Sequence, residues 1–336
     1  MREADIRPIA LLNEYLRLSA EDAKAFFAND ASFSARNCPG CAANDAKQAF
    51  EKDGFNFVRC RNCQTLYANP APAAEVLAEF YRASPSQEYW ARTFFPAVAV
   101  ARREKIFRPR VARIREIITK TKGSAGRLVD VGAGTGIFLE ECRAAELGGQ
   151  LAAIEPNDGL AALCRESGFE TFEGFAGDAT RADDSAWRES ADLVTCFEVI
   201  EHVLDTTSFI EELAGLLRPG GTLLFTGLCG TGFDILTLNE HSKAVAPPHH
   251  LNFLSRDGVE RLLARAGLTL STLLTPGELD VDIVRNTYRE IPGIPLDPFI
   301  EFLIQSDDNQ AQANFQIFLK ENALSSHMWV VARKPN

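Results

Sequence analysis

The sequence has no long apolar run and no excess of basic residues. None of its apolar stretches approaches the roughly 20 residues that a membrane-spanning helix needs. Lysine and arginine number 35 against 46 aspartates and glutamates, which gives a net charge of −11. Because a broad basic surface is what holds nucleic acid or an anionic membrane by charge, this balance counts against both partners. The first residues carry early acids and no apolar signal segment, so we expect a cytoplasmic protein.

Cysteine is sparse outside one cluster. Eight cysteines are present, and in a chain without an export signal the scattered ones are most simply buried thiols. The scattered four are Cys142, Cys164, Cys196 and Cys229.

The other four cysteines form two C-x-x-C pairs, Cys38 with Cys41 and Cys60 with Cys63. Their separation matches a structural zinc site with four thiolate ligands, which leaves no open position for catalysis. The alternating run at 55–59 predicts a strand between the pairs, so residues 36–72 are expected to form a zinc ribbon. A redox C-x-x-C and a pair of disulfides are the alternatives.

The central motif of the chain is the run LVDVGAGTG at 128–136. It begins as an apolar strand, places three glycines at alternate positions and continues with helical spacing. A strand that turns sharply into a helix brings backbone N–H groups close to a ligand, and glycine permits that approach. The spacing differs from the dinucleotide fingerprint G-x-G-x-x-G, whose third glycine would fall at Ile137.

Three further segments accompany this motif in a fixed order. A second strand at 151–154 ends on Glu155, where an acidic residue can hold a ribose diol. A third strand at 191–197 leads into the sequence EVIEH, and a helical stretch then runs to Leu217. The turn RPGG and a strand at 222–225 complete the set.

Over about residues 125–270 this ordered set resembles the class I S-adenosylmethionine (SAM)-dependent methyltransferases. The resemblance implies an α/β Rossmann-like fold, a seven-stranded sheet with an antiparallel terminal strand pair. It places the three glycines along the methionine half of SAM, Asp130 at its amino group, Glu155 at its ribose and the loop 174–178 near the adenine. The expected SAM-binding residues are Asp130, Gly132, Ala133, Gly134, Gly136, Glu155, Pro156, Phe175 and Phe197.

The run from the second C-x-x-C through Tyr67, Pro70 and Pro72 to Tyr81 resembles the zinc-binding extension that precedes many bacterial class I methyltransferases. Several such relatives act on sugars, particularly nucleotide-linked ones. The expected division is a helical segment at 1–35, the ribbon at 36–72, a helical linker or lid at 73–124 and the methyltransferase domain at 125–336. An insertion at 276–325 precedes the last strand, and insertions there often cover the acceptor.

The chemistry is expected just past the strand at 191–197, because ligands of open α/β sheets lie beyond the carboxyl ends of the strands. Glu198, Glu201 and His202 stand there at spacings i, i+3 and i+4, so a helix would present them in one direction. With His249 or His250 they could hold a second, divalent metal ion. This pattern resembles the small-RNA 2′-O-methyltransferases and the ubiquinone-pathway O-methyltransferases. A metal-free general base, His202 or His250, and a purely structural role are the alternatives.

The favoured function is SAM-dependent methylation of a small polar acceptor, a hydroxyl of a sugar or related metabolite. C-methylation of a nucleotide-linked keto-sugar is the alternative. RNA 2′-O-methylation is weakened by the acidic balance, and an NAD-dependent oxidoreductase by the glycine spacing. A non-enzymatic zinc-ribbon adaptor disagrees with the intact set of SAM-binding residues. The sequence does not indicate an oligomeric state.

Overall fold

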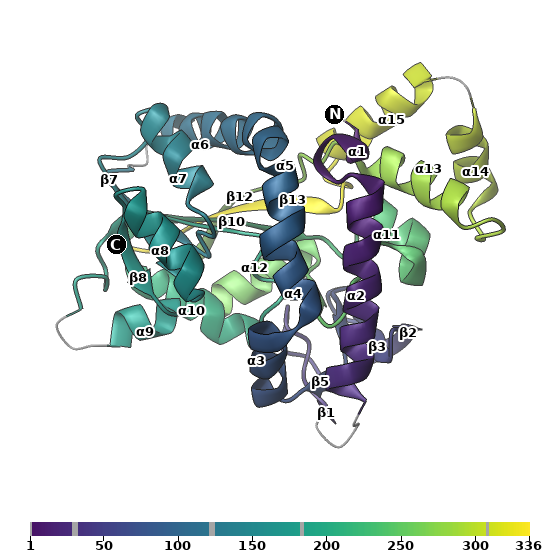
Figure 1. Ribbon diagram of the computed structural model, residues 1–336, viewed down its shortest axis with the longest axis horizontal. Coiled ribbons are helices and arrows are strands. Elements are labelled where there is room, and N and C mark those ends of the chain that lie inside the picture. The colour runs from purple at the N-terminus through teal and green to yellow at the C-terminus, as the bar shows by residue number, and fades with distance from the viewer. Residues whose placement is uncertain (1, 29–32, 121–124, 182–184, 307–308) are drawn as a thin grey trace.

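The computed structural model describes residues 2–28, 33–120, 125–181, 185–306 and 309–336. Residues 121–124, at the end of the expected linker, lie outside the described residues. A seven-stranded sheet forms the centre of the larger part of the chain (Figure 1), in the order β12-β13-β10-β9-β6-β7-β8. Its strands are β6 (Arg127–Val131), β7 (Gln150–Glu155), β8 (Glu170–Glu173), β9 (Ala191–Phe197), β10 (Leu217–Leu228), β12 (Thr269–Leu274) and β13 (His327–Arg333).

The direction of the strands confirms the expected Rossmann-like fold. Strands β8, β7, β6, β9 and β10 are parallel. Strand β13 runs antiparallel to both β10 and β12. The carboxyl ends of β6, β7 and β9 therefore meet at one edge of the sheet, where a ligand can reach all three.

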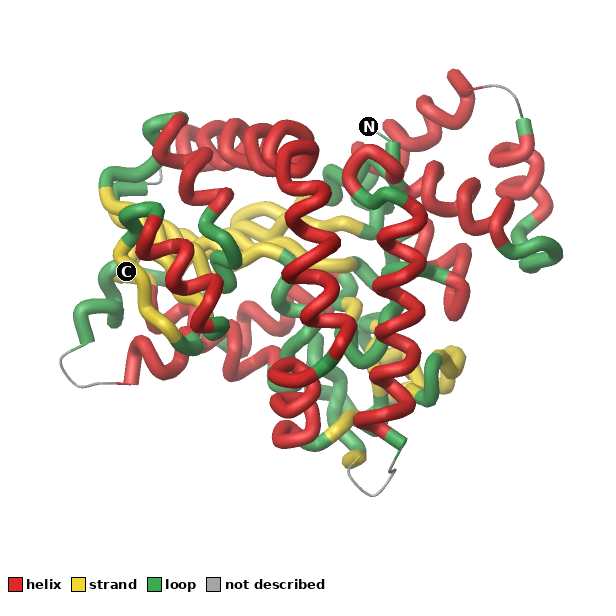
Figure 2. The backbone as a smooth tube through the Cα atoms, in the orientation of Figure 1, coloured by secondary structure: helices red, strands yellow, loops and turns green. Residues whose placement is uncertain are grey.

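Helices cover both faces of this sheet (Figure 2), because its strands are apolar on both sides. Val129 faces a core that includes α10 and α12, and the next residue back, Leu128, faces a second core that includes α6 and α7. The helices along the sheet are α6 (Arg108–Lys120), α7 (Ile137–Ala144), α8 (Asp158–Glu166), α9 (Ala176–Arg181), α10 (Thr206–Leu216) and α12 (Arg256–Arg265).

The amino-terminal part combines long helices with a second, four-stranded sheet of order β11-β4-β3-β2. Strand β11 comes from far along the chain: Asn252 pairs with Tyr67 and Phe253 with Leu66. The second sheet is therefore completed by the segment that follows His250. The elements are α1 (Glu3–Ile6), α2 (Ile9–Phe27), β1 (Phe33–Ser34), β2 (Ala46–Lys52), β3 (Phe55–Cys60), β4 (Leu66–Ala68), β5 (Ala71–Pro72), α3 (Ala74–Ala83), α4 (Pro85–Tyr89), α5 (Phe95–Arg102) and β11 (Asn252–Phe253), with π-helical turns at Trp90–Phe94 and Arg103–Phe107.

Partly buried polar contacts fasten the second sheet to the part of the chain that contains the seven-stranded sheet. The Arg36 guanidinium donates to the carbonyl oxygens of Leu204 and Leu251 at 3.1 and 3.0 Å. Arg265 donates to the carbonyl oxygen of Gly40 at 2.6 Å. These contacts hold the cysteine-rich segment against the elements that follow β9.

The insertion between β12 and β13 is helical, and it packs against α11 (Phe233–Leu238), as Leu238 and Val284 share one apolar cluster. It also reaches α1, since the backbone N–H of Glu3 donates to Asp282 at 2.8 Å. In Figure 1 it lies beside α1, at the upper right. Its helices are α13 (Asp280–Glu290), α14 (Pro298–Gln305) and α15 (Asn309–Glu321). In the described part of the chain, no helix combines the length and apolar character needed to cross a bilayer.

Candidate functional site

The glycine-rich loop between β6 and α7 has the backbone that its sequence requires. Gly132, Gly134 and Gly136 adopt φ angles of +73°, +57° and +77°, which residues with a Cβ rarely tolerate. The Gly134 N–H donates to one carboxylate oxygen of Glu155 at 2.8 Å, and the Asn157 N–H donates to the other at 3.0 Å. Glu155, at the end of β7, is thus fixed against the loop.

Asp130 lies beneath the same loop and is 2% exposed. Its carboxylate accepts a hydrogen bond from the Thr195 hydroxyl of β9 at 2.7 Å. Burial raises the pKa of Asp130 to about 7, although Thr195 and the nearby Arg110 charge oppose the shift. The carboxyl group therefore changes charge near neutral pH.

The remaining expected SAM-binding residues lie along this edge of the sheet. Ala133 is buried in the loop, and Pro156 is exposed just after Glu155. Phe175 is 65% exposed beyond the end of β8, so its ring is free to stack on a ligand. Phe197, the last residue of β9, packs against Phe138 with ring centroids 4.8 Å apart.

Glu198 differs from the sequence expectation, because residues 198–205 are not helical. Helix α10 begins only at Thr206, where the Asp205 side chain accepts the N–H groups of residues 207 and 208, and Glu198 itself has a φ of +56°. The side chains of Glu198, Glu201 and His202 therefore do not share one face of a helix.

The carboxylate of Glu198 contacts groups that sequence reasoning missed. The Thr226 hydroxyl donates to it at 2.5 Å, His327 Nε2 lies 2.7 Å away and Arg110 Nη2 3.6 Å away. Burial alone would raise the pKa of Glu198, but His327, Arg110 and Thr226 together lower it. No local sequence signal indicates His327, because its partner lies in the turn after β9, 129 positions earlier in the chain.

Glu201, His202 and His250 converge. Each offers one ligand atom, and these atoms lie within 4.8 Å of one another. Glu201 is 1% exposed, and its Oε2 atom has no hydrogen-bond partner among the described residues. A buried carboxylate oxygen without a partner is costly, so the arrangement fits a cation held by these three side chains. Burial and the charge of nearby Glu198 raise the pKa of Glu201 in the absence of such a cation.

The two histidines of this cluster are oriented through their Nδ1 atoms. His250 Nδ1 donates to the carbonyl oxygen of Ala244 at 2.6 Å. His202 Nδ1 lies 3.0 Å from the Tyr81 hydroxyl, which in turn donates to the His249 carbonyl oxygen at 3.3 Å. This assignment leaves Nε2 of both rings as a lone-pair donor. Burial lowers the pKa of His202 to about 3 and also lowers that of His250, so both rings are neutral at physiological pH.

His249 has a different environment from His250. It is fully buried, and its ring nitrogens contact the Ser86 hydroxyl at 3.0 Å and the Gln87 amide at 3.2 Å. Its ring packs on Phe80 with centroids 4.8 Å apart. Of the two histidines, the structure thus brings His250 to the cluster and gives His249 a packing role that ties α4 to the site.

The four cysteines of the amino-terminal pairs also converge. Their Sγ atoms lie within 4.8 Å of one another, and the Cys38–Cys63 and Cys41–Cys60 pairs are each 3.5 Å apart as free thiols. Tetrahedral zinc with thiolates at about 2.3 Å requires sulfur atoms about 3.8 Å apart, so the cluster fits a four-thiolate metal site. Thr65 Oγ1 lies 3.2 Å from Cys63 Sγ, as an outer-shell partner would.

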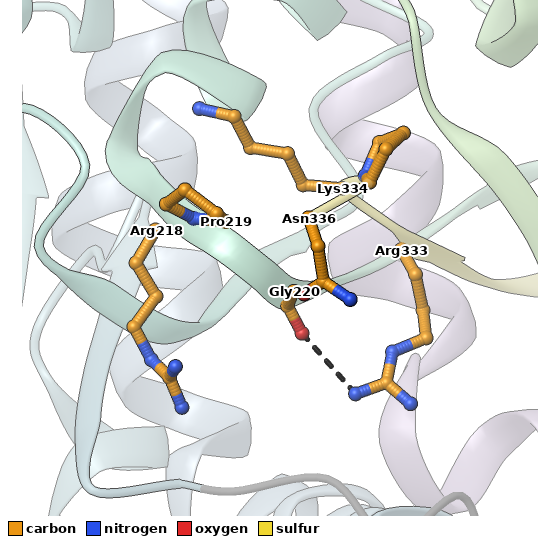
Figure 3. Close-up of a pocket in the computed structure, with 7 residues that line it drawn as sticks. Arg218, Pro219, Gly220, Arg333, Lys334 and Asn336 are labelled. Carbon is orange, nitrogen blue, oxygen red and sulfur yellow. Dashed lines mark hydrogen bonds between the residues drawn. The ribbon is translucent and has the colours of Figure 1, made fainter.

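A separate pocket lies at the opposite edge of the sheet, where β10 begins and β13 ends (Figure 3). Arg333 spans it by donating to the carbonyl oxygen of Gly220 at 3.1 Å. Arg218, also in its lining, pairs with Asp192. Because the parallel strands point away from it, this pocket is no part of the site described above.

Comparison with known proteins identifies the domain. A family model described as a methyltransferase domain matches residues 100–273, slightly more than half of the chain. A ubiquinone biosynthesis O-methyltransferase of Xanthomonas euvesicatoria is 31% identical over 166 residues, covering 47% of this chain and 69% of the relative. The corresponding enzyme of Nitrobacter winogradskyi is 28% identical over 175 residues, covering 52% of this chain and 61% of the relative.

The chain therefore spans about two thirds of the length of these curated relatives. Among solved structures, a SAM-dependent methyltransferase from Archaeoglobus fulgidus aligns with 68% of this chain and 94% of its own, at 15% identity and a TM-score of 0.45.

Proposed function

Because this chain belongs to the methyltransferase-domain family and is a SAM-dependent methyltransferase, we propose that it methylates a hydroxyl oxygen of a small polar acceptor. The observation that carries the proposal is the convergence of Glu201, His202 and His250 beside the SAM-binding edge. The relatives named as O-methyltransferases support transfer to oxygen. A sugar or related metabolite, including a nucleotide-linked sugar, is the acceptor class that we propose.

On the SAM side, we assign each group by its place around the glycine-rich loop. Glu155 would accept the ribose hydroxyls, and Asp130 in its ionised form would attract the amino group. Phe175 has an exposed ring that could stack on the adenine. Arg110, whose charge acts on both Asp130 and Glu198, would pair with the carboxylate of SAM.

On the acceptor side, we propose that Glu201, His202 and His250 hold a divalent cation. When bound, such a cation would hold two neighbouring oxygens of the acceptor and favour the deprotonated hydroxyl. The chain's own residues prepare this site: the contacts of Tyr81 and Ala244 keep both Nε2 atoms available, and burial keeps both rings neutral.

Methyl transfer requires that the acceptor oxygen forms a bond to the methyl carbon as the bond from that carbon to sulfur breaks. The hydroxyl proton must leave, and Nε2 of His202 or His250 can accept it if no cation is present. That metal-free arrangement would also serve carbanion formation on a keto-sugar, which keeps C-methylation as the second proposal. The two proposals differ in their need for a cation.

We also propose that the four cysteines hold a structural zinc ion, which would stabilise the second sheet without taking part in the reaction. The cysteine segment contacts the segments that follow β9 and β11 through buried groups. The Ser255 hydroxyl donates to the Cys63 carbonyl oxygen, and the Thr206 hydroxyl donates to the Pro39 carbonyl oxygen at 2.7 Å. The ion would therefore help to position the loop that carries His250.

The decisive experiment is transfer of labelled methyl from SAM into fractionated host extract, with and without a chelator that removes weakly held divalent ions. Label in a small-molecule fraction that disappears with chelator and returns with Mg²⁺ or Mn²⁺ would support the metal-assisted O-methyltransferase. Label that is unchanged by chelator would favour the metal-free histidine base, and label in RNA would contradict a small acceptor. The Asp130→Asn protein is the matched control, because it should bind SAM poorly and label nothing.

A further inference from the structure

Arg102, the last residue of α5, is a partly buried cation without an anionic partner. The next basic side chains along the sequence are paired: Arg103 with Glu140 and Glu141, Lys105 with Asp5, and Arg108 with Glu141. Among the residues that the structure describes, no carboxylate forms an ion pair with Arg102, and its Nε atom is buried without a hydrogen-bond partner. Its guanidinium lies 5.8 Å from the centroid of the Phe95 ring.

The charges around Arg102 are mostly of its own sign. Burial lowers its pKa to about 10, and the positive charges of Arg7 and Arg110 add to this effect, while Glu198 opposes it. Glu198 does not neutralise the charge of Arg102, because its carboxylate already contacts Thr226, His327 and Arg110. A local excess of positive charge thus remains in a chain whose overall charge is −11.

This excess lies on the acceptor side of the site. Arg7 directly follows α1 and precedes α2, whose Tyr15 ring packs against His249, the residue before His250, with centroids 5.2 Å apart. Val98, one turn before Arg102 in α5, shares an apolar cluster with Leu12 and Tyr15 of α2. In Figure 1, α1 and α5 stand close together, and Lys105 Nζ, just beyond α5, lies 2.8 Å from the Asp5 carboxylate of α1. Arg7 directly follows α1 and Arg102 ends α5, so both arginines come from packed segments that adjoin the loop of His249 and His250.

An arginine removed from water without a counter-charge is costly, so a protein retains such a group where a ligand supplies the missing charge. The planar guanidinium presents paired N–H donors that match the oxygens of a phosphate or a carboxylate. SAM also carries a carboxylate, but Arg110 is the arginine assigned to that group, since its charge acts on Asp130 and its guanidinium lies 4.1 Å from the Phe197 ring centroid.

We propose that Arg102 and Arg7 form an anion subsite beside His250, and that the methyl acceptor carries a phosphate or carboxylate group which this subsite holds. The proposal rests on the assignment of the acceptor to the Glu201, His202 and His250 cluster. It narrows the acceptor from small polar molecules in general to anionic ones. A nucleotide-linked sugar has such a group in its diphosphate, whereas a neutral sugar or a neutral phenol has none.

The test uses the full chain saturated with S-adenosylhomocysteine, which fills the cofactor site. Inorganic phosphate, pyrophosphate and acetate are then titrated separately by calorimetry. We expect one anion per chain, with a dissociation constant that rises at least tenfold in Arg102→Gln. Pyrophosphate or phosphate binding more tightly than acetate identifies a phosphorylated acceptor, and the reverse order identifies a carboxylate.

Two variants make the comparison specific. Arg92→Gln removes the same charge from an arginine that is 79% exposed and paired with Glu88, and it should bind the anion as the unaltered chain does. Arg102→Lys keeps the charge and should recover part of the affinity, which separates charge loss from a folding defect.

Two results would overturn the subsite. One is equal affinities in Arg102→Gln and Arg92→Gln. The other is absence of anion binding in the S-adenosylhomocysteine complex; an anion that then binds to the cofactor-free chain would show that the arginines hold the SAM carboxylate. A failure of the proposed function would be visible separately, as absence of label in every small-molecule fraction of the methyl-transfer experiment, which does not depend on anion titration.

Discussion

His327 Nε2 lies 2.7 Å from Glu198 Oε1, although the two residues are 129 positions apart in the chain. The contact joins the first residue of β13 to the turn after β9, across β10, whose Thr226 hydroxyl donates to the same carboxylate oxygen. Glu198 is therefore held from one side by the sheet, while Glu201 is the carboxylate that meets the histidines.

This relationship predicts different roles for the two carboxylates in cation binding. We expect Glu201→Gln to raise the dissociation constant for Mn²⁺ at least about a hundredfold, because it removes a charged ligand. Glu198→Gln should raise it only about tenfold, as an outer-shell change does. Electron paramagnetic resonance of Mn²⁺ checks both, and equal effects would show that Glu198 is itself a ligand.

Glu155→Ala should weaken SAM binding about tenfold to a hundredfold. The variant removes the expected acceptor of the ribose hydroxyls and also releases the Gly134 and Asn157 N–H groups that shape the loop. Calorimetric titration with SAM measures the change. Glu166→Ala, which alters an exposed acid of α8, is the control, and an unchanged affinity in Glu155→Ala would refute the ribose assignment.

SAM affinity should depend on pH through Asp130, whose pKa burial raises to about 7. A raised carboxyl pKa means that the group gains its proton as pH falls through 7, and the neutral form no longer attracts the amino group of SAM. Between pH 8 and pH 6 the ionised fraction of such a group drops about tenfold, so the dissociation constant should rise by about that factor. Asp130→Asn should bind SAM weakly, with a dissociation constant that does not change with pH. A pH dependence as steep as that of the unaltered chain would show that another group titrates.

The unaltered protein should contain one zinc ion per chain, and Cys60→Ser should contain much less. The variant should also lower the melting temperature by about 10 °C or more, because the ion would hold the four cysteine side chains of the second sheet together. Elemental analysis and circular dichroism measure the two effects. Cys229→Ser, a change at a buried thiol outside the cluster, should leave the zinc content unchanged. Purified protein with no zinc would disprove the ribbon assignment.

The sequence predicted the parts of the fold that depend on local pattern. The strand expected at 191–197 is β9 with those bounds, and the strand expected to end at Glu155 is β7. Helix α12 likewise begins where the sequence has a capping residue, because the Ser255 side chain accepts the Gly258 N–H. In each case a short apolar run or a capping residue decides the structure within a few positions.

Contacts between distant segments were not predictable in this way. His327 meets Glu198 only through the antiparallel pairing of β13 with β10, and Arg110 meets Glu198 through packing of α6. The helical spacing of Glu198, Glu201 and His202 predicted a shared helix face, which is wrong. Asp205 was the available signal, because it caps α10 and places the preceding motif in a turn.

Strand β11 has a consequence for how the protein is made. The second sheet starts with residues near the amino terminus but receives its edge strand from Asn252 and Phe253. During synthesis β11 leaves the ribosome long after β2, β3 and β4, so one edge of these three strands stays uncovered until then. Early binding of a metal ion by the four cysteines would stabilise β2, β3 and β4 before β11 is available. A shortened gene product that ends before residue 252 would keep this edge of the sheet unpaired.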